Sequence, residues 1–161
     1  MNRNASCIIL AAGKGTRMKS EKPKVLCEVL FRPMLDWVAE SAVTAGIEKI
    51  CIVIGCGGEY VKEHVAKTKL YEGKTCFALQ QEMLGTGHAV MQTRPFLEQN
   101  LDNDVLILCG DAPFIDSKTI EESYTYHHRH KNSATVISAI LDDPTNYGRI
   151  IRKGGNVQKI V

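Results

Sequence analysis

The chain has no hydrophobic run long enough to cross a membrane. Its longest apolar segments, such as 7–10 and 50–54, have the length of strands, whereas a spanning helix needs about 20 apolar residues. The first of these segments begins within a few residues of Met1, which leaves no room for a signal peptide. We therefore expect a soluble cytoplasmic protein without a membrane partner.

The chain also has little net charge. Its 20 basic and 18 acidic residues give a formal charge of +2, and the basic residues are dispersed. Because nucleic-acid-binding surfaces gather lysine and arginine, no such partner is indicated. With 161 residues and 44% hydrophobic side chains, the composition predicts a globular chain of one domain.

Cys-x-x-Cys pairs are absent, and the spacing of Cys51 and Cys56 matches no common zinc site. We therefore expect six free thiols and no structural metal. Four of them lie in strand-like apolar runs, where cysteine behaves as a small buried hydrophobe: Cys7, Cys51, Cys76 and Cys109. The other two, Cys27 and Cys56, are candidates for exposure, although no adjacent base marks either as a nucleophile.

Two common phosphate-binding sequences are missing as well. No Gly-x-x-x-x-Gly-Lys-Ser/Thr string occurs, which excludes a P-loop. A dinucleotide fingerprint needs a third glycine after Gly13 and Gly15, but Met18 stands there. The next strand-like run ends in Gly55 and Cys56, without a carboxylate to hold a ribose.

Apolar strand-like runs and amphipathic helical stretches alternate along the chain. We expect strands near 6–10, 49–54, 75–79, 104–108 and 134–141, and helices near 33–45, 59–67, 86–93 and 117–130. Pro33 suits a first helical position and Gly46 a helix stop. Continuously apolar strands joined by helices predict an α/β fold with a mostly parallel sheet, covered on both faces.

The end of the chain has a different pattern. Segments 147–151 and 157–161 flank Lys153-Gly154-Gly155-Asn156, which predicts a hairpin turn. The chain stops at Val161, inside an apparent strand. We therefore expect residues 1–161 to be the N-terminal portion of a truncated domain.

The most informative segment runs from Leu10 to Lys24 and includes Ala11, Ala12, Gly13, Gly15 and Thr16. A strand that opens into a turn of small residues exposes backbone N–H groups to a phosphate. Arg17 and Lys24 add two cations at the same place. The segment therefore predicts a triphosphate cradle at the carboxyl end of a parallel strand. The alternative is an ordinary turn with incidental charges.

Two further strand ends carry polar groups. Asp111 follows Gly110 after an apolar run and is our candidate magnesium ligand, although an aspartate before Ala-Pro can also shape a turn. Gln80 and the backbone of Gly85 can pair with the edge of a pyrimidine. Thr86 contributes there or as the N-cap of the next helix, and we expect His88 to be structural.

These motifs, in this order, resemble the sugar-nucleotide pyrophosphorylases. The nearest branch is the N-terminal uridyltransferase domain of the bacterial bifunctional N-acetylglucosamine-1-phosphate uridyltransferase/glucosamine-1-phosphate acetyltransferases. The matching strings lie at 10–18, 23–26, 80–89, 110–111 and 143–150. The resemblance implies a Rossmann-like three-layer fold of the glycosyltransferase-A type. It also implies synthesis of UDP-N-acetylglucosamine, a precursor of cell-wall peptidoglycan, from UTP and N-acetylglucosamine 1-phosphate with Mg²⁺.

The same resemblance implies a role for each matching residue. Leu10, Ala11, Ala12 and Gly13 would contact the nucleoside, and Gln80, Gly85 and Thr86 would recognise uracil. Gly15, Thr16, Arg17 and Lys24 would surround the phosphates, Asp111 would bind magnesium, and Gly148 would contact the sugar.

The chain departs from the family in two ways. Asn146 stands where glycine is usual, although asparagine tolerates a left-handed backbone. More sugar ligands, a second magnesium ligand and the acetyltransferase β-helix lie beyond Val161 in the family, as does any expected oligomer contact. Two alternatives therefore stay open: a nucleotidyltransferase for another sugar phosphate, and a nucleotide-binding fragment without catalysis.

Overall fold

The computed structural model describes residues 4–13, 22–145 and 147–161. The chain divides into two compact units, Met1–Tyr126 and His127–Val161. Gly15, Thr16 and Arg17, together with Asn146, lie outside the described residues.

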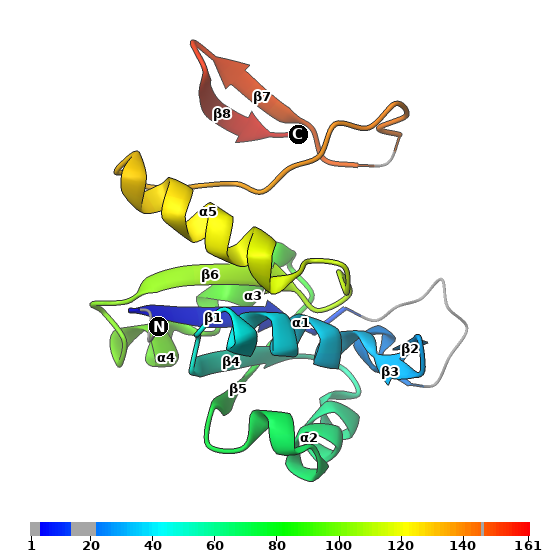
Figure 1. Cartoon of the computed structure of the whole chain (residues 1–161). Helices are drawn as coiled ribbons and strands as arrows, with labels where there is room; N and C mark the ends of the chain where they lie inside the picture. The colour runs from blue at the N-terminus through cyan, green and yellow to red at the C-terminus, as the bar shows by residue number, and fades with distance from the viewer. Residues whose placement is uncertain (1–3, 14–21, 146) are drawn as a thin grey trace. The chain divides into compact units, whose positions relative to one another are not determined.

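A parallel sheet forms the centre of the first unit (Figure 1). Its strands are β1 (Ala5–Leu10), β4 (Lys49–Ile54), β5 (Thr75–Leu79) and β6 (Asp104–Cys109), in the order β5-β4-β1-β6. All three strand pairs are parallel, which confirms the predicted parallel sheet. The chain leaves β1 toward β4 and later returns on its other side as β6. The strand order therefore reverses beside β1, where open α/β sheets bind ligands.

Alternate residues of the strands enter two separate cores. Ile9, Ile52 and Leu108 belong to the larger one, with α1 (Met34–Thr44), α2 (Gly58–Lys67) and Ile120 of α5 (Ser117–Arg129). Ile8 and Val53 belong to the smaller one, packed against α3 (Thr86–Met91) and α4 (Arg94–Glu98). Because successive side chains of a strand point to opposite faces, apolar strands covered on both sides give the three predicted layers.

Short elements connect the sheet to its helices. A 3₁₀ turn, η2 (Lys24–Leu26), and a small hairpin of β2 (Glu28–Val29) and β3 (Arg32–Pro33) precede α1, and η3 (Lys69–Tyr71) follows α2. Pro33 is the N-cap of α1 instead of its first helical residue. Gly46 follows the helix at φ 88°, which confirms it as the stop, because glycine adopts a positive φ at no steric cost.

The helix predicted over 86–93 is wrong in its extent, since α3 ends at Met91 and a separate helix, α4, begins at Arg94. Pro95 lies in the first turn of α4. A proline inside a continuing helix would remove one hydrogen bond and clash with the preceding turn. The buried Thr93 hydroxyl donates to the Val90 carbonyl at 2.7 Å and satisfies the end of α3.

Asp36 forms a buried polar network between α1, α2 and η3. Its side chain is 8% exposed, and its Oδ1 accepts a hydrogen bond from the Tyr71 hydroxyl at 2.6 Å. His64 Nε2 lies 2.8 Å from the same oxygen. Burial, followed by this bond to Asp36, raises the pKa of Tyr71 well above its ordinary value. The network ties the helices that cover one face of the sheet.

The second unit contains the predicted hairpin. Strands β7 (Ile150–Lys153) and β8 (Asn156–Ile160) pair antiparallel. Gly154 and Gly155, at φ 56° and 85°, form its two-residue turn; two successive positive φ values are what a type I′ turn requires.

The strand predicted over 134–141 is wrong, because this segment is irregular. Its apolar side chains are solvent-exposed, and Ile140 is fully so. Strand propensity depends on packing against a neighbouring strand and a covering layer. An apolar, β-branched composition is therefore insufficient to form a strand when a neighbouring strand and a covering layer are missing.

All six cysteines are free, as expected. Cys7 and Cys51 are buried, but the prediction was wrong for Cys76 and Cys109, which are exposed. Their strands, β5 and β6, are the outer ones of the sheet, so neighbours cover them on one side only. Cys27 is half-buried and Cys56 is exposed. No helix in the described segments has both the length and the apolar composition of a membrane span.

Candidate functional site

The ends of the parallel strands bring several predicted residues to one edge of the sheet. The ladder continues past the strands: Ala11 N–H donates to the Val53 carbonyl at 2.8 Å, and Gln80 N–H donates to that of Ile54 at 2.8 Å. On the other side of β1, Gly110 N–H donates to the Leu10 carbonyl at 3.0 Å. Three loops therefore leave the sheet from a common edge, and they contain Ala11, Gln80 and Asp111. Leu10 is the last residue of β1 at the same edge.

Two glycines allow these loops to pack closely. A Cβ on Gly55 would stand 2.7 Å from the Ala12 carbonyl oxygen, and one on Gly110 would stand 3.0 Å from that of Leu10. Any larger residue would push the loops apart. The sequence indicated Gly110 as a tight exit but gave no signal for Gly55, because its neighbour Ala12 lies in a distant loop, the one that follows β1. Gly13 is exposed with open space around it, so its backbone is accessible.

Lys24 and Asp111 form an ion pair at this edge. Lys24 Nζ donates to Asp111 Oδ2 at 2.6 Å, and the two side chains are 39% and 40% exposed. Lys24 begins η2, directly after Pro23, and Asp111 follows β6. The pair spans 87 positions of sequence. The structure therefore brings together the cation and the carboxylate that sequence alone placed on separate loops.

The surroundings of Asp111 suit a hard divalent cation. One half-exposed carboxylate leaves room for waters and substrate phosphates, which complete the shell of Mg²⁺ in nucleotide enzymes. Lys24 already demonstrates that this oxygen attracts positive charge. Within the described residues there is no cluster of three or more metal-binding side chains.

Cys109 lies two residues before Asp111, and its thiol stays protonated near neutral pH. Burial, and then the charge of Asp111, raise the pKa of this thiol, while Lys24 lowers it. A thiolate is the nucleophilic form of cysteine. The structure therefore gives no reason to assign Cys109 a nucleophilic role.

Gln80 is held in place by the start of α3. Its side chain is 3% exposed, and Nε2 donates to the Gly85 carbonyl at 3.1 Å. His88 Nδ1 lies 3.2 Å from the same Nε2, and His88 Nε2 lies 3.1 Å from Gln92 Nε2. No donor to the Gln80 side-chain oxygen is found in the described part of the chain. The amide is therefore fixed with one acceptor left for a ligand.

The start of α3 differs from one expectation. Gly85, at φ 93°, is the N-cap, and Thr86 is the first helical residue instead of the cap. Glycine fits because the position needs a positive φ, which Thr86 would reach only with strain. Sequence analysis missed that His88 supports Gln80. The available signal was the four-residue spacing of His88 and Gln92, because residues four apart lie on the same face of a helix.

Gly148 lies in the second unit, in the segment before β7. A Cβ there would stand 3.1 Å from Ile160 Cγ2, so the glycine permits close packing against β8. Gly15, Thr16 and Arg17 fall outside the described residues.

Comparison with known proteins identifies the family. Residues 6–161 match the family described as Nucleotidyl transferase. Over 155 residues, the chain is 46% identical to the bifunctional protein GlmU of Acetivibrio thermocellus. The aligned region covers 96% of this chain and 32% of that protein. The bifunctional protein GlmU of Pelotomaculum thermopropionicum is 47% identical over 157 residues, and the aligned region covers 97% of this chain and 33% of that protein. The chain thus spans about one third of the length of these curated relatives.

Solved structures agree on the fold. A UDP-glucose pyrophosphorylase from Acinetobacter baumanii superposes with a TM-score of 0.77 at 20% identity, over 100% of this chain and 67% of that one. The Rossmann-like nucleotidyltransferase fold implied by the sequence motifs is therefore confirmed. With the family match over residues 6–161, the chain belongs to the nucleotidyl transferase family.

Proposed function

We propose that residues 1–161 are the N-terminal portion of a sugar-1-phosphate uridyltransferase domain. The reaction joins UTP and N-acetylglucosamine 1-phosphate into UDP-N-acetylglucosamine and releases pyrophosphate. The observation that carries this proposal is the Lys24–Asp111 ion pair at the sheet edge from which Gln80 also starts. A phosphate-binding cation, a metal-binding carboxylate and a base-recognising amide thus share one edge.

The nucleoside would lie against the first loop and the start of α3. Leu10, Ala11, Ala12 and Gly13 would contact the nucleoside: Ala11 and Ala12 are small and buried, and the backbone of Gly13 is exposed. Gln80 and Gly85, with Thr86, supply the donors and acceptors that a uracil edge needs. Hydrogen bonds from Gln80 to Gly85 and His88 fix the amide before the base arrives, which lowers the ordering cost of binding.

The phosphates would lie between the first loop and Asp111. Lys24 stabilises the reacting α-phosphate, and Arg17 the β- and γ-phosphates of the leaving pyrophosphate, with Gly15 and Thr16 beside them. Asp111 holds Mg²⁺, which when bound neutralises charge on the phosphate oxygens. The attacking sugar phosphate is already anionic, so no general base is needed. Catalysis then consists of in-line positioning and charge stabilisation.

Binding by calorimetry tests the base assignment on the 161-residue chain. We expect UTP with magnesium to bind more tightly than CTP or ATP, because the Gln80 side-chain oxygen accepts a hydrogen bond, which uracil N3–H can donate and the N3 of cytosine cannot, and because a purine is larger than a pyrimidine. Gln80→Leu should weaken UTP binding by about tenfold, the loss of ~1.4 kcal/mol. Gln81→Leu changes the exposed neighbour and serves as the matched control. Equal or tighter ATP binding would contradict the uracil assignment.

Lys24→Ala tests the phosphate assignment. We expect UTP binding to weaken by roughly tenfold, with the melting temperature unchanged, because half-exposed ion pairs contribute only about 0–1 kcal/mol. Lys69→Ala, in an exposed position of η3, is the control. If Lys24→Ala lowered the melting temperature sharply and left UTP binding intact, Lys24 would be a structural residue.

A second candidate is nucleotide binding without turnover. It is favoured by the location of Gly148, the one sugar-contact candidate, in a unit without buried residues among those described. A pyrophosphate-release assay separates the two: binding without release supports this candidate. Turnover on the order of 1–100 per second would instead indicate a complete site for both reactants.

A further inference from the structure

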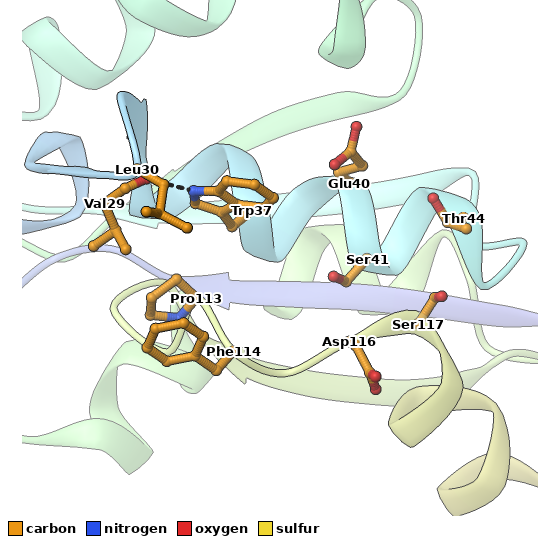
Figure 2. Close-up of a pocket in the computed structure, with 10 residues that line it drawn as sticks. All are labelled: Val29, Leu30, Trp37, Glu40, Ser41, Thr44, Pro113, Phe114, Asp116 and Ser117. Atoms are coloured by element: carbon orange, nitrogen blue, oxygen red, sulfur yellow. Dashed lines mark hydrogen bonds between the residues drawn. The ribbon is translucent and has the colours of Figure 1, made fainter.

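A hollow in the surface of the first unit lies between α1 and the segment that leads from β6 into α5. Its volume is about 370 Å³. Figure 2 shows its two sides: Trp37 and the hairpin residues Val29 and Leu30 face Pro113 and Phe114. These apolar and aromatic walls are typical of small-molecule sites, which usually measure roughly 300–1,000 Å³.

The polar groups of the hollow carry one sign of charge. Glu40 of α1 and Asp116 before α5 stand at its rims, beside the hydroxyls of Ser41 and Ser117. No lysine, arginine or histidine is among the ten lining residues. Hydrogen bonds from Thr119 hold the pKa of Asp116 below its ordinary value, so this carboxylate is charged near neutral pH. An anionic ligand would be repelled, and a cationic one attracted.

The aromatic wall is fixed in place. Trp37 Nε1 donates to the Val29 carbonyl at 2.9 Å, which ties α1 to the hairpin. The Arg32 guanidinium lies 4.9 Å from the centre of the indole ring and pairs with Glu40 at 2.5 Å, yet Arg32 does not line the hollow. The ring is thus rigid and already engages one cation, and tryptophan is the best side-chain partner for cations.

Bulky apolar side chains are exposed around the hollow. Leu30 is 74% exposed and Phe114, on the opposite wall, is 83% exposed. Leu30 and Phe31, at φ 52° and 63°, form the two-residue turn of the β2–β3 hairpin, and a type I′ turn requires these positive values. The hairpin thus holds an apolar side chain beside the hollow, in a turn where asparagine and glycine are usual.

We propose that this hollow binds a small aromatic molecule that carries a positive charge, such as an aromatic amine or amidine. The apolar body would lie between Trp37 and Phe114, and the cation would face Asp116, since Glu40 already pairs with Arg32. None of the residues that line the hollow belongs to the proposed nucleotide site, so the two sites are distinct. Their ligands also differ in charge, because the hollow would take a cation. The segment forming one wall nevertheless begins two residues after Asp111.

The chain contains one tryptophan, so the Trp37 indole N–H gives a single nuclear magnetic resonance signal that reports on this hollow. Titration of the 161-residue protein with benzamidine should shift the signal saturably. Neutral benzamide should bind several-fold more weakly, and benzoate at least about tenfold more weakly. An absence of saturable shift, or equal binding of benzoate, would overturn the proposal.

Two variants locate the ligand. Phe114→Ala should weaken benzamidine several-fold, whereas Leu101→Ala, a leucine of similar exposure outside the hollow, should not. Asp116→Asn should also weaken it, since asparagine keeps an acceptor for the Thr119 N–H but removes the charge. Unchanged binding in both Phe114→Ala and Asp116→Asn would overturn the location. Lys24→Ala should leave benzamidine binding intact, which separates this test from that of the proposed function.

Discussion

The two units of the chain use similar apolar segments with different results. In the first, the strands β1 and β4 are buried, and the residues on their two faces enter two cores. In the second, none of the described residues of 127–161 is buried, although 134–141 is also mostly apolar and rich in β-branched residues. The difference teaches that composition marks a segment as capable of forming a strand, while neighbouring strands and covering helices make it one.

The same contrast holds for polar groups. Asp36 in the first unit is buried and accepts a hydrogen bond from Tyr71. Asp143 in the second unit is exposed and accepts two from Thr145, at 3.0 and 2.6 Å. The first carboxylate joins elements far apart in sequence, whereas the second shapes a local turn.

The largest effect is expected for a core isoleucine. Ile52→Ala, at a fully buried position of β4, should lower the free energy of unfolding by about 2–5 kcal/mol, because it leaves a cavity between packed layers. Ile140→Ala, fully exposed in the second unit, should change it by no more than ~0.5 kcal/mol. Urea denaturation measures both, and similar losses would contradict the contrast.

A smaller effect is expected for the buried carboxylate. Asp36→Ala removes the acceptor of the Tyr71 hydroxyl and the partner of His64, which should cost about 1–3 kcal/mol of unfolding free energy. Asp143→Ala, in the exposed turn, should cause no measurable change in the same urea experiment. If Asp143→Ala proved the more damaging, the turn before β7 would matter more than the network.

The raised pKa of Tyr71 makes stability depend on alkaline pH. Below pH about 10, the ordinary value for tyrosine, the hydroxyl is protonated in both the folded and the unfolded chain. Above it the unfolded chain loses the proton while the folded one keeps it, so stability falls as pH rises. Tyr71→Phe should flatten this fall relative to the unchanged protein in melts between neutral and alkaline pH. Parallel curves would mean that Tyr71 titrates normally.

The smallest effect is expected for removal of the second unit. A chain shortened to residues 1–130 keeps all of α5 and every residue of both cores. Its unfolding free energy should stay within ~0.5 kcal/mol of the full chain. Circular dichroism during thermal unfolding checks this. A large loss would show that the second unit helps to stabilise the first.

Local sequence signals predicted much of the fold. Strands β4 and β5 have the predicted bounds, and the glycine pair 154–155 forms the predicted turn. These succeed because apolar runs and positive-φ glycines act within a few residues. One failure was local, because α3 ends at Met91 and a separate helix begins at Arg94, just before Pro95. Another needed distant information, because 134–141 gained no neighbouring strand. Exposure of Cys76 and Cys109 followed from strand order.

The sequence by itself determined the family and the residue types of the candidate site, since the glycine-rich loop, Gln80 and Asp111 follow apolar strands in a recognisable order. Only the tertiary structure decided which of them meet. Lys24 and Asp111 pair across 87 positions because the sheet places the end of β6 beside that of β1, and His88 supports Gln80 because α3 returns toward the end of β5. Contacts between distant segments depend on strand order and packing, which no local pattern encodes.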